Sequence, residues 1–278
     1  MEGTTRQEQT IIREEMDVKK ICVVMAYHER QYQLTKTLKT IDMSAYSNFS
    51  VVIVDDCSNE DIILPELGYE VDIIKLEDKS WSNCAPVYNY GFIHAISKGA
   101  DTIIIQSAEC YHAGDIISHV AMNIRDDNYI AYGCFRLDRN TTFSEHDIMS
   151  LSKANAFMVN SENNGNGQNA WWNHSVYSPL PQYWCAAITV DNLKEINGID
   201  ERFAYGFAFE DGRFLGQVAS LGLNTEIVDF PFVAHQWHTD QKEDIQDFDA
   251  KYERNKSIYL RMRETDDYKS IHYITPNL

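Results

Sequence analysis

The feature that most constrains the fold is a run of four β-branched residues that ends in two adjacent acids. Residues 51–58 read Val-Val-Ile-Val-Asp-Asp-Cys-Ser. A short apolar run of this kind is typical of a strand buried on both faces, as in a parallel sheet. Asp55 and Asp56 would then lie at the carboxyl end of that strand, where open α/β sheets bind their ligands. Two acids without a lysine make a poor phosphate cradle, but they can accept hydrogen bonds from a base or a ribose.

The size and charge of the chain narrow its class. Its 278 residues fit one large domain or two small ones, and they suffice to bury a substantial core. The formal net charge of −18 argues against binding of DNA or RNA, which needs a basic face, and against an anionic membrane surface. An acidic protein that handles a phosphorylated ligand usually needs a divalent metal or a few local bases, so the charge points indirectly to a metal.

Cysteine usage and the lack of long apolar segments bear on the compartment. The six cysteines are scattered and form no CxxC pair, which is typical of reduced, structural thiols. No apolar stretch reaches the roughly 18 residues that a transmembrane helix requires. Residues 1–20 are polar and charged and do not have the pattern of a signal peptide. We therefore expect a cytoplasmic protein, either of a cell or of something that replicates inside one.

Hydrophobic periodicity predicts alternating strands and helices in the first half of the chain. Buried strands are expected at 21–26, 51–54, 71–76, 102–106 and 129–135. Helices are expected at 32–41, from Pro86 to about Lys98, and at 115–125. This order predicts an α/β fold with a mostly parallel sheet and helices on both faces. Residues 1–19 are expected to form a mobile or weakly helical extension.

The second half of the chain is less regular. Residues 160–173 are rich in Asn, Gly and Gln, which predicts a long loop. Strands are expected at 183–190 and 225–228. Helices are expected from Asp191 to about Gly198, at 210–221 and at 245–262. Because no repeat or linker is evident, we expect residues 20–278 to form a single domain.

Four segments follow one another along the chain, at 23–30 (Val-Val-Met-Ala-Tyr-His-Glu-Arg), 54–58 (Val-Asp-Asp-Cys-Ser), 83–95 with Asn89 and Gly91, and 207–211 (Phe-Ala-Phe-Glu-Asp). Taken in this order they resemble the glycosyltransferases of the GT-A fold, most closely the inverting type of family 2. In that family they correspond to the first strand with its nucleotide-contacting turn, the second-strand signature, the donor-side helix and the acceptor-side acidic pair. Residues 110–115 also resemble a motif of a subgroup found in large viruses.

The resemblance covers about residues 20–240 and implies a GT-A type, Rossmann-like twisted sheet. It implies a nucleotide-sugar-binding half at 20–135, an acceptor-binding half at 136–245, and a C-terminal helix and tail at 246–278. The implied activity is inverting transfer of a hexose or pentose from a nucleotide-sugar to a hydroxyl of a glycan or glycoconjugate. The sugar, the acceptor and the oligomeric state stay open.

The resemblance also implies which residues contact the donor. In the family, the second acid of the second-strand signature contacts the base, and Asp56 holds that position. The other residues expected at the donor are Ala26, Tyr27, Glu29, Asp55, Asn83, Asn89 and Ser107. The expected base is uridine, and guanosine stays open.

The predicted metal site departs from the family pattern. Where the family has Asp-x-Asp, this chain has Ser-Ala-Glu at 107–109. The last acid of that motif commonly binds the divalent metal that bridges the diphosphate, and Glu109 can supply one oxygen ligand to Mn²⁺ or Mg²⁺. His235 and His238 are candidate further ligands, because neutral imidazoles bind such ions and residues three apart share a helix face. The alternative for both is polar packing beside Trp237.

Inverting transfer needs a carboxylate base at the acceptor hydroxyl and positive charge on the departing diphosphate. Asp211 is our candidate base, and Glu210 would hold a hydroxyl, although the two roles can be exchanged. A helix N-terminus stabilises an anion and lowers its pKa, so a base at this position needs compensating burial. The alternative is that both acids only favour the first helical turn.

Three aromatic residues, Trp171, Trp172 and Tyr183, are candidates for an acceptor platform. Sugar C–H faces stack on aromatic rings, although core packing is the more common role of such residues. Two other functions stay open for the whole protein. A nucleotidyltransferase usually requires a glycine- and lysine-rich loop after the first strand, which residues 27–30 do not provide. A non-catalytic nucleotide- or carbohydrate-binding protein would explain the altered metal motif.

Overall fold

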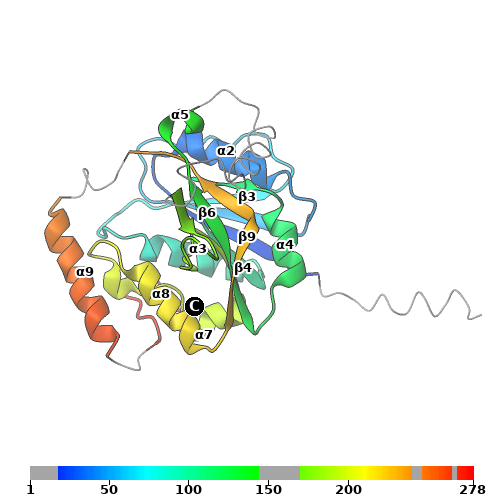
Figure 1. Cartoon of the computed structure of the whole chain (residues 1–278). Coiled ribbons are helices and arrows are strands. Elements are labelled where there is room, and N and C mark those ends of the chain that lie inside the picture. The colour runs from blue at the N-terminus through cyan, green and yellow to red at the C-terminus, as the bar shows by residue number, and fades with distance from the viewer. Residues whose placement is uncertain (1–17, 144–169, 240–245, 265–267) are drawn as a thin grey trace, which may run out of the picture.

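One mixed sheet forms the centre of the fold in the computed structural model, which describes residues 18–143, 170–239, 246–264 and 268–278. Within these ranges the sheet has nine strands in the order β3-β2-β1-β4-β8-β6-β9-β5, with β7 paired to β6 (Figure 1). The strands are β1 (Ile21–Tyr27), β2 (Phe49–Asp55), β3 (Glu70–Lys75), β4 (Thr102–Ser107), β5 (Cys110–Ala113), β6 (Asn128–Arg136), β7 (Trp171–Asn173), β8 (Cys185–Thr189) and β9 (Asn224–His235).

Helices cover both faces of this sheet. They are α2 (Gln31–Ile41), α3 (Ala85–Ser97), α4 (Ile116–Asn123), α5 (Arg139–Thr142), α7 (Val190–Ile196), the 3₁₀ helix η2 (Glu201–Phe203), α8 (Glu210–Ser220) and α9 (Phe248–Met262). Apolar residues of α2 and α4 share one buried cluster with the strands, and those of α3, α7 and α8 share a second cluster. The predicted α/β class is therefore confirmed. A separate finding is that the described ranges contain no helix with the length and apolarity to span a membrane.

Strands β3, β2, β1 and β4 pair in parallel, as the continuous apolar sequences of β2, β1 and β4 predict. In this register Tyr27 lies beside Asp55, and Ala26 lies beside Ser107. The carboxyl ends of β2, β1 and β4 therefore meet at one edge, which we call the donor edge.

Helix α3 lies very close to the sheet. A Cβ at Gly91 would come within 2.4 Å of Val24 Cγ1 on β1. A larger side chain at this position would therefore push α3 away from the strands, so the glycine is required by packing.

The second half of the sheet contains the antiparallel pairs β4–β8, β8–β6 and β9–β5, while β6 and β9 are parallel. The prediction of a short strand at 225–228 was wrong in extent, because β9 continues through Pro231 to His235. The ladder tolerates the proline because the register shifts between Tyr132 and Cys134 of β6, which faces this part of β9.

Other boundaries differ by a few residues. Strand β8 begins only at Cys185, and Val190 already belongs to α7. The predicted loop at 160–173 ends in β7, while its residues 160–169 lie outside the described residues, as do residues 1–17 of the predicted extension. Strands β5 and β7 and helix α5 are too short for periodicity to predict.

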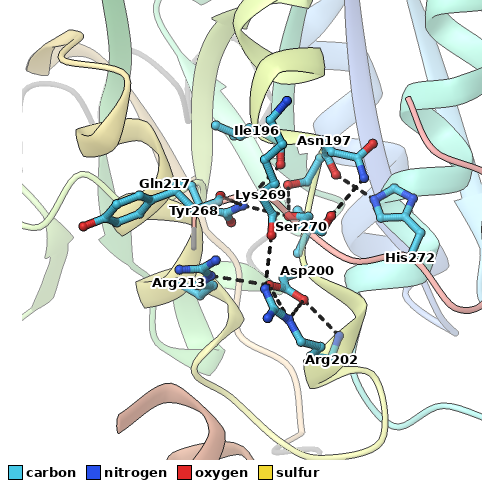
Figure 2. Close-up of polar contacts among 12 residues, drawn as sticks. Ile196, Asn197, Asp200, Arg202, Arg213, Gln217, Tyr268, Lys269, Ser270 and His272 are labelled. Atoms are coloured by element: carbon cyan, nitrogen blue, oxygen red, sulfur yellow. Dashed lines mark hydrogen bonds and ion pairs between the residues drawn. The ribbon is translucent and has the colours of Figure 1, made fainter. Parts of the chain in front are cut away.

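The C-terminal segment is held by a buried polar network beside α7 and α8. Asp200 accepts hydrogen bonds from Arg202 and Arg213, and Gln217 of α8 donates to the carbonyl of Tyr268 and to Ser270 Oγ at 2.8 Å each (Figure 2). Buried charges need such pairing. The network therefore joins α8 both to Asp200, which precedes η2, and to the C-terminal segment at Tyr268 and Ser270.

The tail itself is anchored on a second buried acid. The carboxylate of Glu201 is 0 % exposed and accepts from the backbone N–H groups of Tyr273 and Ile274 at 2.6 Å. Within the described residues, the chain end thus packs against the fold near α7 (Figure 1).

Candidate functional site

The donor edge carries acidic side chains and one arginine, which follow three neighbouring strands. Asp55 and Asp56 stand at the end of β2, Arg30 follows β1, and Glu109 follows β4. Ligands of open α/β sheets bind at such an edge. The geometry thus brings together the residues that the sequence placed at the ends of separate strands.

Asp56 holds the position expected to contact the base. Its carboxylate accepts hydrogen bonds from Trp81 Nε1 at 2.8 Å and from Lys79 Nζ at 2.5 Å. These contacts orient both oxygens, and each oxygen keeps a lone pair for a further donor. Asp56 is thus an ordered acceptor at the edge, and its contact with a base stays a prediction.

Asp55 is almost fully buried, at 1 % exposure, and its Oδ1 accepts from the backbone N–H of Ser58 at 3.0 Å. It therefore shapes the turn that presents Asp56. Glu29 adopts a left-handed φ of 49° and accepts from the side chain of Asn59. The contacts of Asp55 with Ser58 and of Glu29 with Asn59 thus fix the backbone at the donor edge.

The remaining residues expected at the donor divide into two groups. Ala26, Tyr27 and Ser107 are the last residues of β1 and β4, at the donor edge. Asn89 lies instead in the core at 0 % exposure, where it donates to the carbonyl of Ile199 at 2.8 Å and accepts from the same residue's N–H at 2.9 Å. We therefore correct its expected donor contact to a structural role, which arises because α3 turns this face inward.

The acidic pair stands at the start of α8, behind a strained turn. Ala208 and Phe209 have φ values of 60° and 73°, a left-handed conformation that non-glycine residues rarely adopt. Glu210 accepts a hydrogen bond from Asn83 Nδ2 at 2.6 Å. Because Asn83 precedes α3 at the donor edge, this contact joins the acidic pair to the donor side of the site.

The surroundings of the pair favour proton exchange. Burial, and then the neighbouring charge of Asp211, raise the pKa of Glu210 to about 7. Burial also raises the pKa of Asp211, whose carboxylate accepts from Gln182 Nε2 at 2.7 Å and from the N–H of Gly212 at 2.6 Å. The described groups that donate to the two acids are neutral, namely the amides of Asn83, Gln182 and Gly212 and the thiol of Cys84. The catalytic role of Asp211 and the hydroxyl-binding role of Glu210 stay predictions.

Helix α9 supports this turn from outside (Figure 1). Asn255 is 0 % exposed, and its Nδ2 donates to the carbonyls of Phe203 and Ala208 at 3.0 Å each. A Cβ at Gly206 would lie 2.0 Å from Asn255 Oδ1, so the glycine permits the close approach. The role of Asn255 could not be predicted from the sequence, because no local pattern marks an asparagine on a mostly polar helix.

The predicted metal ligands lie near one another, and the guanidinium of Arg30 lies between Glu109 and His238. Arg30 Nε lies 3.3 Å from Glu109 Oε1, and Arg30 Nη2 lies 3.3 Å from His238 Nδ1. Within the described residues, no group of three or more His, Cys, Asp or Glu side chains is placed to hold a metal ion. Glu109, His235 and His238 therefore do not fit a resident divalent cation in this arrangement.

His235 lies among aromatic rings. Its ring centroid is 4.5 Å from that of Trp172 and 5.4 Å from that of Trp184, and burial lowers its pKa to about 4. It is therefore a neutral imidazole at neutral pH.

Of the three aromatic candidates for an acceptor platform, only Trp172 is half-buried. Trp171 packs on Phe232, and Tyr183 on Phe214, at exposures of 5 % and 7 %. We therefore correct these two to core residues, because the sheet and α8 cover them, and keep Trp172.

Comparisons with known proteins agree with the fold. No family model and no curated protein matches the sequence. Among solved structures, TarS of S. aureus is similar with a TM-score of 0.51 and 14 % identity, over 78 % of this chain and 37 % of that chain. TarS residues 1–349 in complex with UDP-GlcNAc give a TM-score of 0.54 and 13 % identity, over 82 % of this chain and 61 % of that one.

A third similar structure is the mannosyltransferase PcManGT from Pyrobaculum calidifontis in complex with GDP-Man and Mn²⁺. Its TM-score is 0.54 and its identity 11 %, over 92 % of this chain and 70 % of that one. Such low identities show the fold alone, which is the α/β fold of GT-A glycosyltransferases. The chain spans well under two thirds of full TarS. The resemblance to the viral subgroup finds no support among these structures.

Proposed function

We propose that this protein, with its GT-A fold, transfers a sugar from a nucleoside-diphosphate sugar to a hydroxyl acceptor with inversion. The expected donor is a UDP-sugar, and the expected acceptor is a glycan or glycoconjugate. The observation that supports this most is the half-buried Glu210–Asp211 pair behind a strained turn, linked through Asn83 to the donor edge. Strain of this kind persists at functional sites because the surrounding structure enforces it.

The acidic pair can serve the chemistry of a single displacement. The acceptor oxygen attacks C1 of the sugar, and its proton passes to a carboxylate oxygen of Asp211. The bond from C1 to the diphosphate oxygen breaks, and the nucleoside diphosphate leaves with the electron pair. Gln182 and the Gly212 N–H orient Asp211, and its burial offsets the effect of the helix N-terminus on its pKa.

Glu210 would hold a sugar hydroxyl beside the reacting centre. Its raised pKa leaves part of the population protonated at neutral pH, so it can donate as well as accept a hydrogen bond. Trp172 would offer an apolar face to the acceptor. No step of this proposal passes through a divalent metal, because a guanidinium already lies between Glu109 and His238.

The test is a panel of UDP- and GDP-sugars with simple glycosides as acceptors, each assayed with Mn²⁺ and with a chelator. We expect release of a nucleoside diphosphate together with a new glycoside, and NMR of the anomeric proton should show inversion. Retention would contradict the single displacement. Nucleotide binding without turnover across the panel would support the non-catalytic binding protein instead.

A further inference from the structure

We propose that Arg30 binds the donor diphosphate directly, at the place where the sequence predicted a divalent metal. Donor binding and transfer then need no divalent cation. This inference rests on the proposed function, since it concerns the leaving group of the same reaction. The departing diphosphate gains negative charge, and a fixed positive group beside it lowers the barrier.

The position of Arg30 follows from the sheet. Arg30 lies three residues after β1, and Glu109 two residues after β4, and these strands are parallel neighbours. Both side chains therefore emerge at the donor edge, next to the end of β2 that carries Asp56. A nucleotide whose base contacts Asp56 would extend its phosphates along this edge.

The guanidinium of Arg30 is incompletely satisfied by the described protein groups. Its side chain is 13 % exposed. The buried Nε lies 3.3 Å from Glu109 Oε1, but it is not aligned for a hydrogen bond and has no other acceptor among the described residues. A buried N–H without an acceptor leaves the positive charge of the guanidinium incompletely compensated, and the exposed part of the side chain is where a ligand oxygen can bind. The planar guanidinium matches the spacing of phosphate oxygens.

A divalent ion does not fit beside this guanidinium. Mg²⁺ binds oxygen ligands at about 2.0–2.1 Å and needs nearly octahedral geometry. An ion on Glu109 would therefore lie within a few ångströms of Arg30, with two positive charges in contact. Glu109 instead holds the guanidinium in place, and its own negative charge opposes an incoming diphosphate.

These roles give opposite expectations for Glu109. A metal ligand would be needed for donor binding, and Glu109→Gln would weaken it. If Glu109 only positions Arg30, the amide oxygen of Glu109→Gln still presents a partial negative charge to the guanidinium. The loss of one negative charge then leaves diphosphate binding unchanged or tighter.

The test measures binding of UDP and UMP by calorimetry, with EDTA and with Mn²⁺, to the full chain and to four variants. The variants are Arg30→Gln, Arg30→Lys, Glu109→Gln and the control Arg263→Gln. Arg263 is exposed at the end of α9, and its substitution changes the net charge equally. GDP and GMP replace the uridine nucleotides if the wild type prefers them. Circular dichroism and the thermal midpoint show whether each variant is folded.

We expect equal UDP affinity with EDTA and with Mn²⁺. Arg30→Gln should lose about ten- to a hundredfold in UDP affinity, the range for hydrogen bonds to a charged group, while UMP affinity changes much less. Arg30→Lys should lose less, Glu109→Gln should bind at least as well in EDTA, and Arg263→Gln should match the wild type.

Two results separate the possible failures. UDP binding that requires Mn²⁺, is lost in Glu109→Gln and persists in Arg30→Gln would overturn this inference and leave the proposed function standing. No binding of any nucleoside diphosphate under either condition would contradict the proposed function itself.

Discussion

The acidic turn at Glu210–Asp211 and the corner formed by Arg30 and Glu109 both belong to the proposed site, but their acids have opposite surroundings. In the turn, two adjacent half-buried carboxylates have only neutral hydrogen-bond donors around them in the described part of the chain, and the loss of solvent raises the pKa of both. In the corner, one carboxylate lies beside a guanidinium. The surroundings of an acid therefore decide its chemistry: the turn can take up a proton, whereas the corner holds a cation.

The two regions are also supported differently. The turn needs outside support, because its left-handed residues Ala208 and Phe209 are strained, and Asn255 of α9 donates to the carbonyl of Ala208. The corner follows directly from two parallel strands that end side by side. Substitutions in the two regions should therefore differ in their effects on rate, on pH dependence and on stability.

The largest effect should come from removing the base of the turn. Asp211→Asn keeps the shape of the side chain but cannot accept the acceptor's proton, so transfer should fall by at least about a hundredfold. Calorimetric binding of the donor nucleotide should stay within about threefold, because the contacts with the donor edge are intact. Near-normal turnover in this variant would show that the base is assigned wrongly. Asp249→Asn, at an exposed position in α9, is the matched control.

Exchanging an acid for an amide should change stability at pH 8 in opposite directions in the two regions. The pKa of Glu210 is raised in the folded state, so the folded protein binds more protons than the unfolded chain between about pH 4.5 and 7. Wild-type stability thus decreases through this window, and Glu210→Gln should remove that decrease, a gain of about 1–3 kcal/mol at pH 8. Urea unfolding at pH 5 and pH 8 measures this.

For the corner, Glu109→Gln should lower stability by about 1 kcal/mol at pH 8, because it leaves the guanidinium without its counter-charge. Glu264→Gln is the exposed control for both substitutions. If Glu210→Gln loses stability at pH 8 as much as Glu109→Gln does, the contrast between the two regions is wrong.

A smaller effect should follow from loosening the support of the turn. Asn255→Ala removes two hydrogen bonds to buried carbonyls and should lower the unfolding free energy by about 1–3 kcal/mol. Because the acids lose their placement, kcat should fall about tenfold while nucleotide affinity is unchanged. A merely structural role would leave kcat of the folded fraction as in the wild type. Ser257→Ala, two residues further on α9 and exposed, is the control.

The smallest effect should concern the acceptor. Trp172→Ala should raise the acceptor KM about threefold to tenfold with little change in donor KM, because one stacking face is lost. The matched substitution Trp171→Ala should instead lower the thermal midpoint, since Trp171 packs in the core. Equal acceptor KM values in the two variants would remove Trp172 from the site.

Much of the site's frame could be predicted locally. The apolar runs that become β1, β2 and β4 are continuous, and the acids follow them directly, so parallel pairing places Asp56 and Glu109 at one edge. The helix that begins at Glu210 was also predicted correctly. These features depend on residues close together in the chain.

Other features could not be predicted because they depend on contacts between distant segments. Asn89 appears polar and available in the sequence, but the packing of α3 on the residue 199 region buries it. The strand predicted at 225–228 stopped before Pro231, but a register shift in the neighbouring β6 allows β9 to continue through this proline.

The sequence by itself determined the α/β class, the order of the first strands and the position of the acids at their ends, because hydrophobic periodicity and chain direction are local properties. The tertiary structure alone decided that Arg30 meets Glu109, 79 residues away, and that Asn255 supports the turn before Glu210. Side-chain neighbours across the fold depend on how whole elements pack, and no short stretch of sequence encodes that packing.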